Sequence, residues 1–106
     1  MNNKEFEITQ ETSSTEGINK YFVKGHINSI SAPALQYEMD KALKSGQTNI
    51  VLNMTLVEFL SSAGIRVILK TYKDAEAAGG RLAIELPSEN VINVLGMTAL
   101  DQMLVK

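Results

Sequence analysis

The chain has 106 residues, of which 44% are hydrophobic and 21% charged, and its formal net charge is −2. This length suits one domain, and the slightly negative charge without a Lys/Arg cluster argues against nucleic acid as a partner. The chain has no cysteine, which excludes disulfides and thiolate chemistry and fits a cytoplasmic location. Because no apolar run approaches the roughly 20 residues of a membrane span, direct membrane insertion is not expected.

Two strands are predicted near the start of the chain. Residues 5–11 alternate apolar and polar side chains through Phe6 and Ile8, which is the period of a strand with one solvated face. A polar, turn-rich segment follows, and residues 18–25 then form a β-favouring stretch. We expect these two strands to pair as an antiparallel hairpin.

The middle of the chain alternates helices with strands. A first helix begins near Pro33, which fits a first helical turn, and ends at Gly46. The apolar run within residues 49–54 predicts a central strand covered on both sides. A second helix follows and stops at Gly79-Gly80. The predicted buried stripes are Leu35, Met39, Ala42 and Leu43 in the first helix, and Ile65, Ile68, Leu69, Tyr72 and Ala75 in the second.

The last part of the chain predicts one more strand and a short helix. Residues 81–86 alternate as a strand, which Pro87 ends because proline has no N–H to donate. Ser88 is placed to cap a short helix that ends at Gly96. Residues 98–101 resemble a further capping box, which predicts a small helix at the C-terminus.

The resulting order of elements is strand, strand, helix, strand, helix, strand, helix. It predicts one α/β domain over residues 1–106, without an internal repeat or a linker long enough to divide it. The sheet is expected to be mixed, with about four strands and three to four helices, because helical crossovers link parallel strands while the first pair is antiparallel.

Few residues could carry catalysis. The one histidine, His26, is far in the sequence from Ser61 and Ser62, and there is no Gly-x-Ser-x-Gly motif. No spacing of histidines, cysteines or acidic residues predicts a metal site. We therefore expect a protein without catalytic residues, metal or cofactor. A small hydrolase that uses Ser62 and His26 is an alternative for which no orienting group is identifiable.

Two serines interrupt the apolar run between Val57 and Leu69. Ser61 and Ser62 precede an alanine and Gly64, a composition that suits a helix start, where free N–H groups need acceptors and a close neighbour needs bare backbone. From spacing alone, this segment is either a helix cap or a regulatory site.

Residues 59–69, Phe-Leu-Ser-Ser-Ala-Gly-Ile-Arg-Val-Ile-Leu, resemble the central motif of STAS domains, the family of bacterial anti-sigma factor antagonists. Residues 25–35, 50–53 and 96–101 are similar to further segments of that family. Matched residue by residue, Ser62 falls on the family's phosphorylated serine. The resemblance implies a sheet flanked by helices, no catalytic activity, and reversible phosphorylation by a partner serine kinase.

The resemblance also implies a function and a set of contact residues. The chain is expected to be an anti-sigma factor antagonist that binds an anti-sigma factor with serine kinase activity and is switched off by phosphorylation of Ser62. A serine phosphatase is a further expected partner, and a monomer is the expected oligomeric state. The predicted partner-binding residues are Asn28, Ser61, Ser62, Ala63, Gly64 and Arg66.

Three positions depart from the family pattern. Relatives often carry aspartate where this chain has Asn28, Asn53 and Ser61, so the sequence predicts fewer acidic groups around Ser62. Asparagine and serine keep hydrogen-bonding ability while they remove charge. This departure favours an alternative function, a non-phosphorylated STAS adaptor subunit of a transporter ATPase or of a larger signalling assembly.

Overall fold

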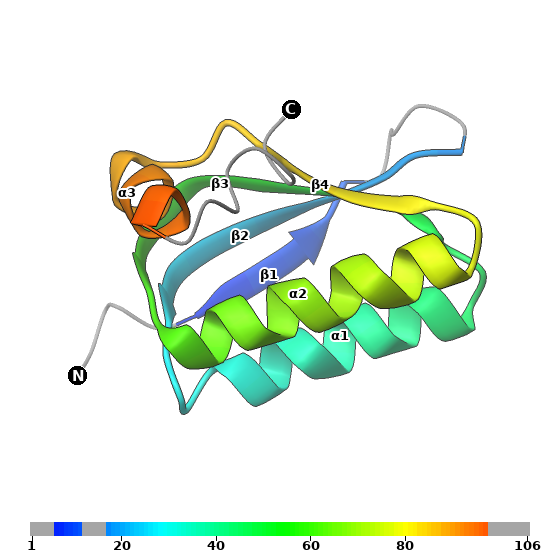
Figure 1. The fold of residues 1–106 in the computed structure, drawn as a ribbon, viewed down its shortest axis with the longest axis horizontal. Coiled ribbons are helices and arrows are strands. Elements are labelled where there is room, and N and C mark those ends of the chain that lie inside the picture. Colours follow the sequence, from blue (N-terminus) through cyan, green and yellow to red (C-terminus); the bar gives the residue numbers. More distant parts are fainter. Residues whose placement is uncertain (1–5, 12–16, 98–106) are drawn as a thin grey trace.

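A computed structural model describes residues 6–11 and 17–97, and its elements follow the predicted order (Figure 1). The seven elements are β1 (Glu7–Gln10), β2 (Asn19–Ile27), α1 (Ala32–Lys44), β3 (Asn49–Leu60), α2 (Ser62–Ala77), β4 (Arg81–Glu85) and α3 (Glu89–Met97). The predicted helix after residue 97 lies outside the described residues.

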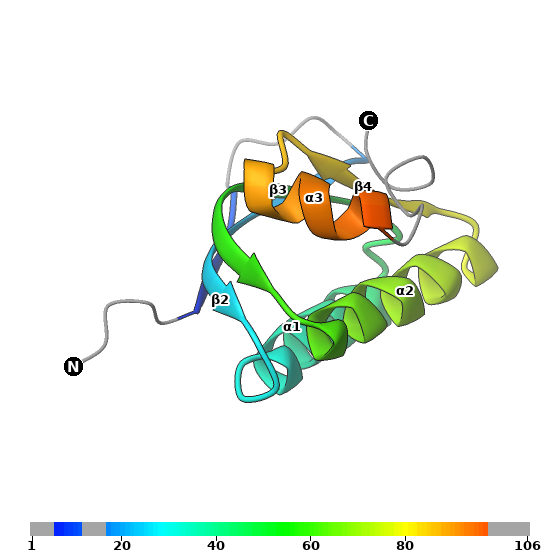
Figure 2. The same ribbon diagram turned by 60° about the vertical axis from the view of Figure 1, so that its left-hand side comes forward.

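The strands form one mixed sheet in the order β1-β2-β3-β4. β1 pairs antiparallel with β2, whereas β2 with β3 and β3 with β4 are parallel. α1 and α2 lie side by side on the same face of this sheet, as Figures 1 and 2 show. The predicted mixed sheet, with an antiparallel first pair and helical crossovers, is confirmed.

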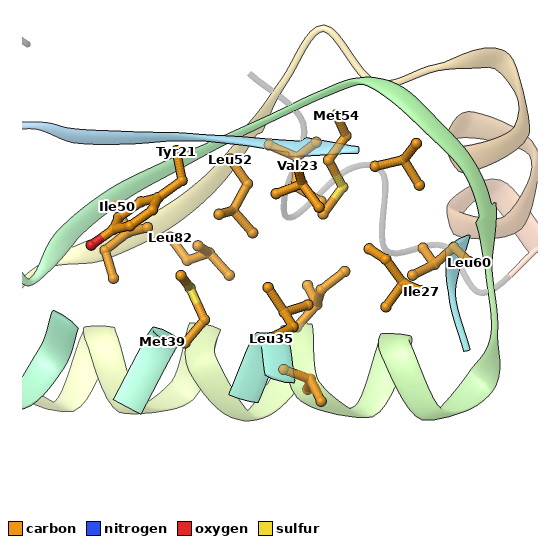
Figure 3. Packing of buried hydrophobic residues seen from close by; sticks show 14 of the residues in the cluster. Tyr21, Val23, Ile27, Leu35, Met39, Ile50, Leu52, Met54, Leu60 and Leu82 are labelled. Carbon is orange, nitrogen blue, oxygen red and sulfur yellow. The ribbon is translucent and has the colours of Figure 1, made fainter. Parts of the chain in front are cut away.

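The hydrophobic core fills the space between the sheet and these two helices (Figure 3). Alternate residues of β2 point into this core. The helices and strands β3 and β4 contribute its other buried side chains. The largest fully buried side chains are Val23, Ile27, Leu35, Met39, Ile50, Leu52, Met54, Ile68, Leu82, Ile84 and Leu95.

The buried stripe of α1 agrees with the prediction at Leu35, Met39 and Ala42, whereas Leu43 is only partly buried. The stripe of α2 differs more. Val67 and Thr71 are buried, whereas Ile65, Leu69 and Tyr72 are only partly covered. The reason is that α2 contacts α1 as well as β3 and β4, so its most buried residues face the place where α1 meets the sheet. The Thr71 hydroxyl donates to the Val67 carbonyl at 2.8 Å, which satisfies the polar group inside the core.

β3 is twice as long as predicted, because it continues beyond Met54 to Leu60. Its burial pattern changes after Met54, with the next core positions at Val57 and Leu60. The pairing with β2 contains two register shifts in this region, and such bulges bend a strand and break its two-residue period. Figure 2 shows the resulting curvature of β3.

α3 lies along the second half of β3, beyond the end of β4. Ser88 donates from its backbone N–H to the Met54 carbonyl at 3.1 Å and from its hydroxyl to the Val57 carbonyl at 2.6 Å. The Asn90 side chain donates to the Glu58 carbonyl at 2.7 Å. The start of this helix thus satisfies edge carbonyls of β3 that β4 is too short to reach.

The helix ends follow most of the predicted signals. Gly46 and Gly79 have positive φ angles of 94° and 89° and end α1 and α2, as glycine permits. The N–H of Val91 donates to the Ser88 hydroxyl at 3.3 Å, which confirms the predicted cap. The predicted end of that helix at Gly96 is wrong, because α3 runs through this glycine to Met97.

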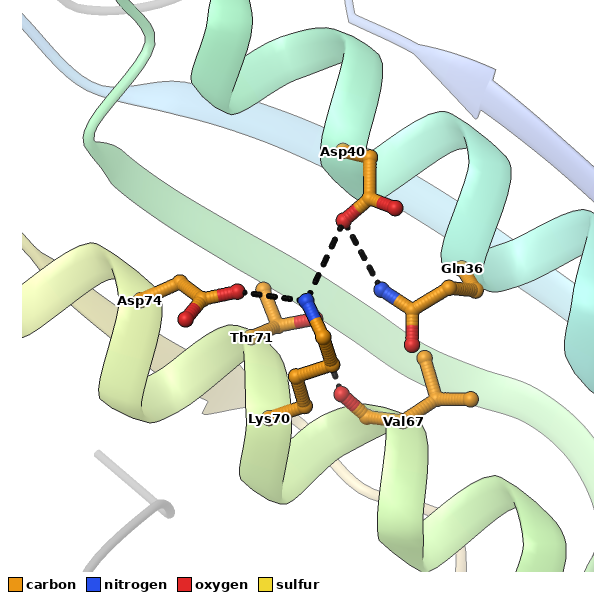
Figure 4. Close-up of polar contacts among 6 residues, drawn as sticks. All are labelled: Gln36, Asp40, Val67, Lys70, Thr71 and Asp74. Carbon is orange, nitrogen blue, oxygen red and sulfur yellow. Dashed lines mark hydrogen bonds and ion pairs between the residues drawn. The ribbon is translucent and has the colours of Figure 1, made fainter.

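A polar network links the exposed sides of α1 and α2 (Figure 4). The Lys70 ammonium lies 2.8 Å from the Asp74 carboxylate and 3.7 Å from that of Asp40, which also accepts from the Gln36 amide at 2.9 Å. The hydrogen bond to Asp74, followed by the charge of Asp40, raises the pKa of Lys70. The lysine therefore stays charged and joins the two helices at the surface. No helix within residues 6–11 and 17–97 has the length and apolar character to cross a bilayer.

We predict opposite effects of alanine at two glycines. A Cβ on Gly80 would overlap the backbone carbonyl of Thr48, so Gly80→Ala should lower the free energy of unfolding by about 2 kcal/mol. A Cβ on Gly96 would meet no described atom within 4 Å, so Gly96→Ala should raise it by about 0.5–1 kcal/mol through helix propensity. Urea unfolding measures both changes, and a neutral Gly80→Ala would contradict the close approach to Thr48.

Candidate functional site

The loop after β2 and the start of α2 meet at one edge of the sheet. Because β2 and β3 are parallel, their carboxyl ends lie at the same edge. The Ser61 N–H donates to the Ile27 carbonyl at 2.8 Å, which joins the two strand ends directly. The structure therefore brings together Asn28, which follows Ile27, and the serine pair, as the sequence predicted.

Ser61 is the N-cap of α2. Its backbone is extended, with φ −90° and ψ 172°, and its hydroxyl accepts from the Gly64 N–H at 3.2 Å. Its carbonyl accepts from the Ile65 N–H at 2.9 Å, which begins the helical hydrogen bonding. The predicted cap is confirmed, and a serine performs it where an aspartate would have added a negative charge.

Ser62 is the first residue of α2, and its side chain is exposed. Among the residues that the structure describes, its hydroxyl takes part in no hydrogen bond. The first turn of α2 contains no acidic residue. An exposed hydroxyl at the positive end of a helix dipole can accept a negatively charged group without unfolding the helix.

Gly64 is buried and has a packing role. A Cβ at this position would lie 2.6 Å from Cγ2 of Ile27 and 2.7 Å from Cδ1 of Leu60. Glycine thus lets α2 approach the ends of β2 and β3 closely. Of the predicted contact residues, Gly64 lies beneath the surface and supports the others from below.

Ala63 and Arg66 line a shallow groove of about 570 Å³ between the N-terminal parts of α1 and α2. Ala63 is half-buried and Arg66 is exposed, so the guanidinium side chain stands at the groove one turn after Ser62. The other lining residues are Ser29, Ala32, Pro33, Gln36, Val67 and Lys70. The groove extends the surface around Ser62 toward the loop after β2.

A compact turn holds the loop after β2. The Asn28 side-chain oxygen accepts from the N–H groups of Ile30 and Ser31 at 2.9 and 3.1 Å. The Ser31 hydroxyl donates to the His26 carbonyl at 2.6 Å and accepts from the Asn28 N–H at 2.9 Å. These bonds fix the loop in the way that asparagine turns do.

The turn presents Ile30, which is 87% exposed, beside Ser29 at the end of the groove. The exposed position of Ile30 is not predicted from the sequence, because an isolated isoleucine gives no periodic signal. The sequence signal is Asn28 followed three residues later by Ser31, just before a helix with proline in its first turn. That pattern is typical of a turn with the two residues between them at its tip.

Two other predicted positions lie elsewhere. His26 points to the face of the sheet opposite α1 and α2, where its ring centroid is 5.7 Å from that of Phe59 and its Nε2 is 3.6 Å from a Glu58 carboxylate oxygen. These contacts give no support to a catalytic pair with Ser62. Among residues 6–11 and 17–97, no group of three or more histidines and acids could hold a metal ion.

The placement of Asn53 around Ser62 is wrong. Asn53 lies in the middle of β3, where its amide donates to the Glu85 carboxylate at 3.1 Å and its oxygen accepts from the Thr55 N–H at 3.1 Å. The eight residues from Asn53 to Ser61 separate it from the start of α2 by about 26 Å of strand at ~3.3 Å per residue. The amide donates where an aspartate would repel Glu85, so this departure concerns the sheet.

The model of the STAS domain family matches residues 9–106. The chain belongs to the STAS domain family.

Individual relatives agree with this assignment. BtrV of Bordetella bronchiseptica, named as a candidate anti-sigma factor antagonist, is 31% identical over 62 residues, which cover 58% of this chain and 53% of BtrV. The match thus spans about half the length of that relative.

Two solved structures share the fold. Unphosphorylated SpoIIAA, an anti-sigma factor antagonist, is similar with a TM-score of 0.79 and 20% identity, over 96% of this chain and 86% of that one. The phosphorylated form of SpoIIAA from Bacillus has a TM-score of 0.73 and 19% identity, over 96% and 89% of the two chains.

We predict that the two serines differ in their effect on stability. Ser61→Ala removes the cap on α2 and should lower the free energy of unfolding by about 1 kcal/mol. Ser62→Ala removes only an exposed hydroxyl and should change it by no more than about 0.5 kcal/mol. Denaturant unfolding of the two variants in parallel measures the difference, and a greater loss in Ser62→Ala would contradict the assigned cap.

Proposed function

We propose that this protein is an anti-sigma factor antagonist that binds an anti-sigma factor with serine kinase activity through the surface around Ser62. Phosphorylation of Ser62 then ends binding. The main observation in support is the exposed hydroxyl of Ser62 in the first turn of α2, in a chain of the STAS family. The name of BtrV and the existence of SpoIIAA in both phosphorylated and unphosphorylated forms support this proposal.

The proposed contact has three parts. Ser62 and Ala63 form its centre, Arg66 and the groove lie on one side, and Ile30 projects from the loop that Asn28 holds. Arginine is enriched at protein-binding surfaces, and the exposed apolar side chain of Ile30 offers area that a partner can bury. Binding, rather than catalysis, is therefore the proposed activity, and the cytoplasm is the proposed location.

The energetics favour a switch of the interface over a switch of the fold. A phosphate on Ser62 meets the positive end of the α2 dipole, an interaction of about 0.3–2 kcal/mol that stabilises the helix. At a partner surface shaped for a neutral hydroxyl, the same charge loses its hydration without compensation and costs several kcal/mol. About 2.8 kcal/mol is enough for a hundredfold loss of affinity.

A second candidate function is a STAS adaptor that binds a transporter ATPase or signalling assembly without being phosphorylated. The observation that favours it is the replacement of acidic residues by Asn28 and Ser61 beside Ser62, which removes carboxylates that a kinase could recognise. The two functions share the contact surface and differ in whether Ser62 is modified. Proteins that co-purify with the native chain distinguish them, because only the first function brings a serine kinase.

We predict that charge at Ser62 abolishes binding. With the cognate kinase and ATP, phosphate should appear on the wild type and be absent from Ser62→Ala. Ser62→Asp should bind the anti-sigma factor about a hundredfold more weakly than wild type in calorimetry. Tyr37→Asp, at an exposed position of α1, adds the same charge and should bind normally. Phosphate on another residue that persists in Ser62→Ala would contradict the assignment of Ser62.

We predict that Ile30 is an anchor of the same interface. Ile30→Asp should weaken binding to the anti-sigma factor at least about tenfold, because a charge replaces an apolar side chain at the contact. The free energy of unfolding of Ile30→Asp should stay within about 0.5 kcal/mol of the wild-type value, since the side chain is exposed. Tyr37→Asp, at an exposed position of α1, is the matched control and should bind as wild type. Equal binding by both variants would remove Ile30 from the interface.

A further inference from the structure

The sheet face opposite α1 and α2 carries a cluster of exposed apolar side chains. Tyr21, Val23 and Ile27 of β2 point into the core, so the intervening positions of that strand point to the other face. Across the pairing with β3, Lys24 lies next to Leu56, and His26 next to Phe59. The open-face cluster consists of Phe22, Leu56 and Phe59, which are 41%, 60% and 46% exposed.

Charged groups of opposite sign lie on the two strands of this face. Lys24 is exposed on β2. Glu58 is on β3, and its side chain is 51% exposed with the carboxylate 3.6 Å from Nε2 of His26. Since His26 is on the open face, the Glu58 carboxylate is there as well. On these two strands Lys24 is therefore positive and Glu58 negative, with Glu7 of β1 paired across from Lys24 and the apolar cluster spread over β2 and β3.

We propose that this face is the contact of a homodimer, in which two copies pack sheet against sheet about a two-fold axis parallel to the strands and between β2 and β3. Rotation about that axis places β2 of one copy over β3 of the other. Lys24 of each copy then lies within a side chain's reach of Glu58 of the other, and the two apolar clusters face each other. An axis across the strands would instead place β2 over β2, lysine toward lysine.

The size of the face sets the strength of this dimer. The four strands have 4, 9, 12 and 5 residues. At about 3.3 Å per residue and ~4.8 Å between strands, the face measures on the order of 480 Å² per copy, below the roughly 800 Å² of a standard interface. The dimer is therefore weak and dependent on concentration, which differs from the monomer expected from the sequence.

The sequence alone hides this surface, because its members come from two strands. Phe22, Leu56 and Phe59 are separated by polar or core residues, and the register of β2 with β3 brings them together. Aligned packing of two sheets at about 10 Å leaves room for aromatic and aliphatic side chains between them. The face carries groups of both signs, so a second copy can add opposite-charge contacts while it covers the apolar area.

Sedimentation velocity of the full chain from about 1 µM to about 1 mM tests the proposal. Wild type should pass from monomer to dimer in this range, and Leu56→Lys should raise the dissociation constant at least about tenfold. Tyr37→Lys, at an exposed position on the opposite side of the sheet, is the control and should dimerise as wild type. A wild type that stays monomeric throughout, or a Leu56→Lys variant that dimerises equally well, overturns the proposal.

A charge exchange tests the axis itself. Lys24→Glu should weaken dimerisation, and adding Glu58→Lys in the same chain should restore it to within about threefold of wild type, because the pair is reversed across the axis. Lack of rescue in a folded double variant overturns the proposed orientation. The measurement needs no kinase or anti-sigma factor, so its failure leaves the proposed function of Ser62 standing, and a failure at Ser62 leaves the dimer standing.

Discussion

The junction of β3 with α2 depends on one hydrogen bond and one absent side chain. The Ser61 N–H binds the Ile27 carbonyl, and Gly64 lies close to the side chains of Ile27 and Leu60. Together they hold the start of α2 against the ends of two parallel strands, and the helix can leave the sheet only in one direction. Ser62 lies between the cap and the buried glycine, so its backbone is fixed from both sides while its hydroxyl faces solvent.

This construction separates stability from recognition at adjacent residues. Ser61 satisfies the free N–H groups of the helix and Gly64 makes the packing possible, whereas Ser62 contributes little to either. A residue that contributes little to stability can be modified without loss of the fold. The core behind it, shared by the sheet and both helices, would keep the surface in place in both states of the proposed switch, so that a change of charge would act on the proposed partner.

Much of the fold follows from sequence patterns, and the failures have physical causes. Capping at Ser61 and Ser88 and the glycines that end α1 and α2 are short-range features, so the sequence carried them. The second half of β3 was missed because bulges break the two-residue period between Met54 and Leu60. The buried residues of α2 differ from the predicted ones because the helix packs against α1 as well as the sheet. The periodicity of one helix does not reveal its second neighbour.

The sequence predicts the centre of the proposed contact but not Ile30 at its edge, for a related reason. The serine pair belongs to one continuous motif, whereas Ile30 reaches the surface through a turn whose hydrogen bonds come from Asn28 and Ser31. Asn53 was grouped with the site by similarity of departure from the family pattern, yet its position in β3 assigns it to Glu85. Contacts that arise from strand register and loop geometry cannot be predicted from residue types alone.

The role of Asn28 connects the loop with the charge at the site. A carboxylate at this position could accept the same two N–H groups that the Asn28 oxygen accepts, so the geometry of the turn does not require the amide. What the amide changes is charge: together with Ser61 it leaves the start of α2 without an acidic neighbour from either residue. A phosphate on Ser62 would then meet the helix dipole without repulsion from these two positions. In the proposed switch the neutral replacements would thus remove one source of repulsion within the domain, and the penalty of the added charge would fall on the interface.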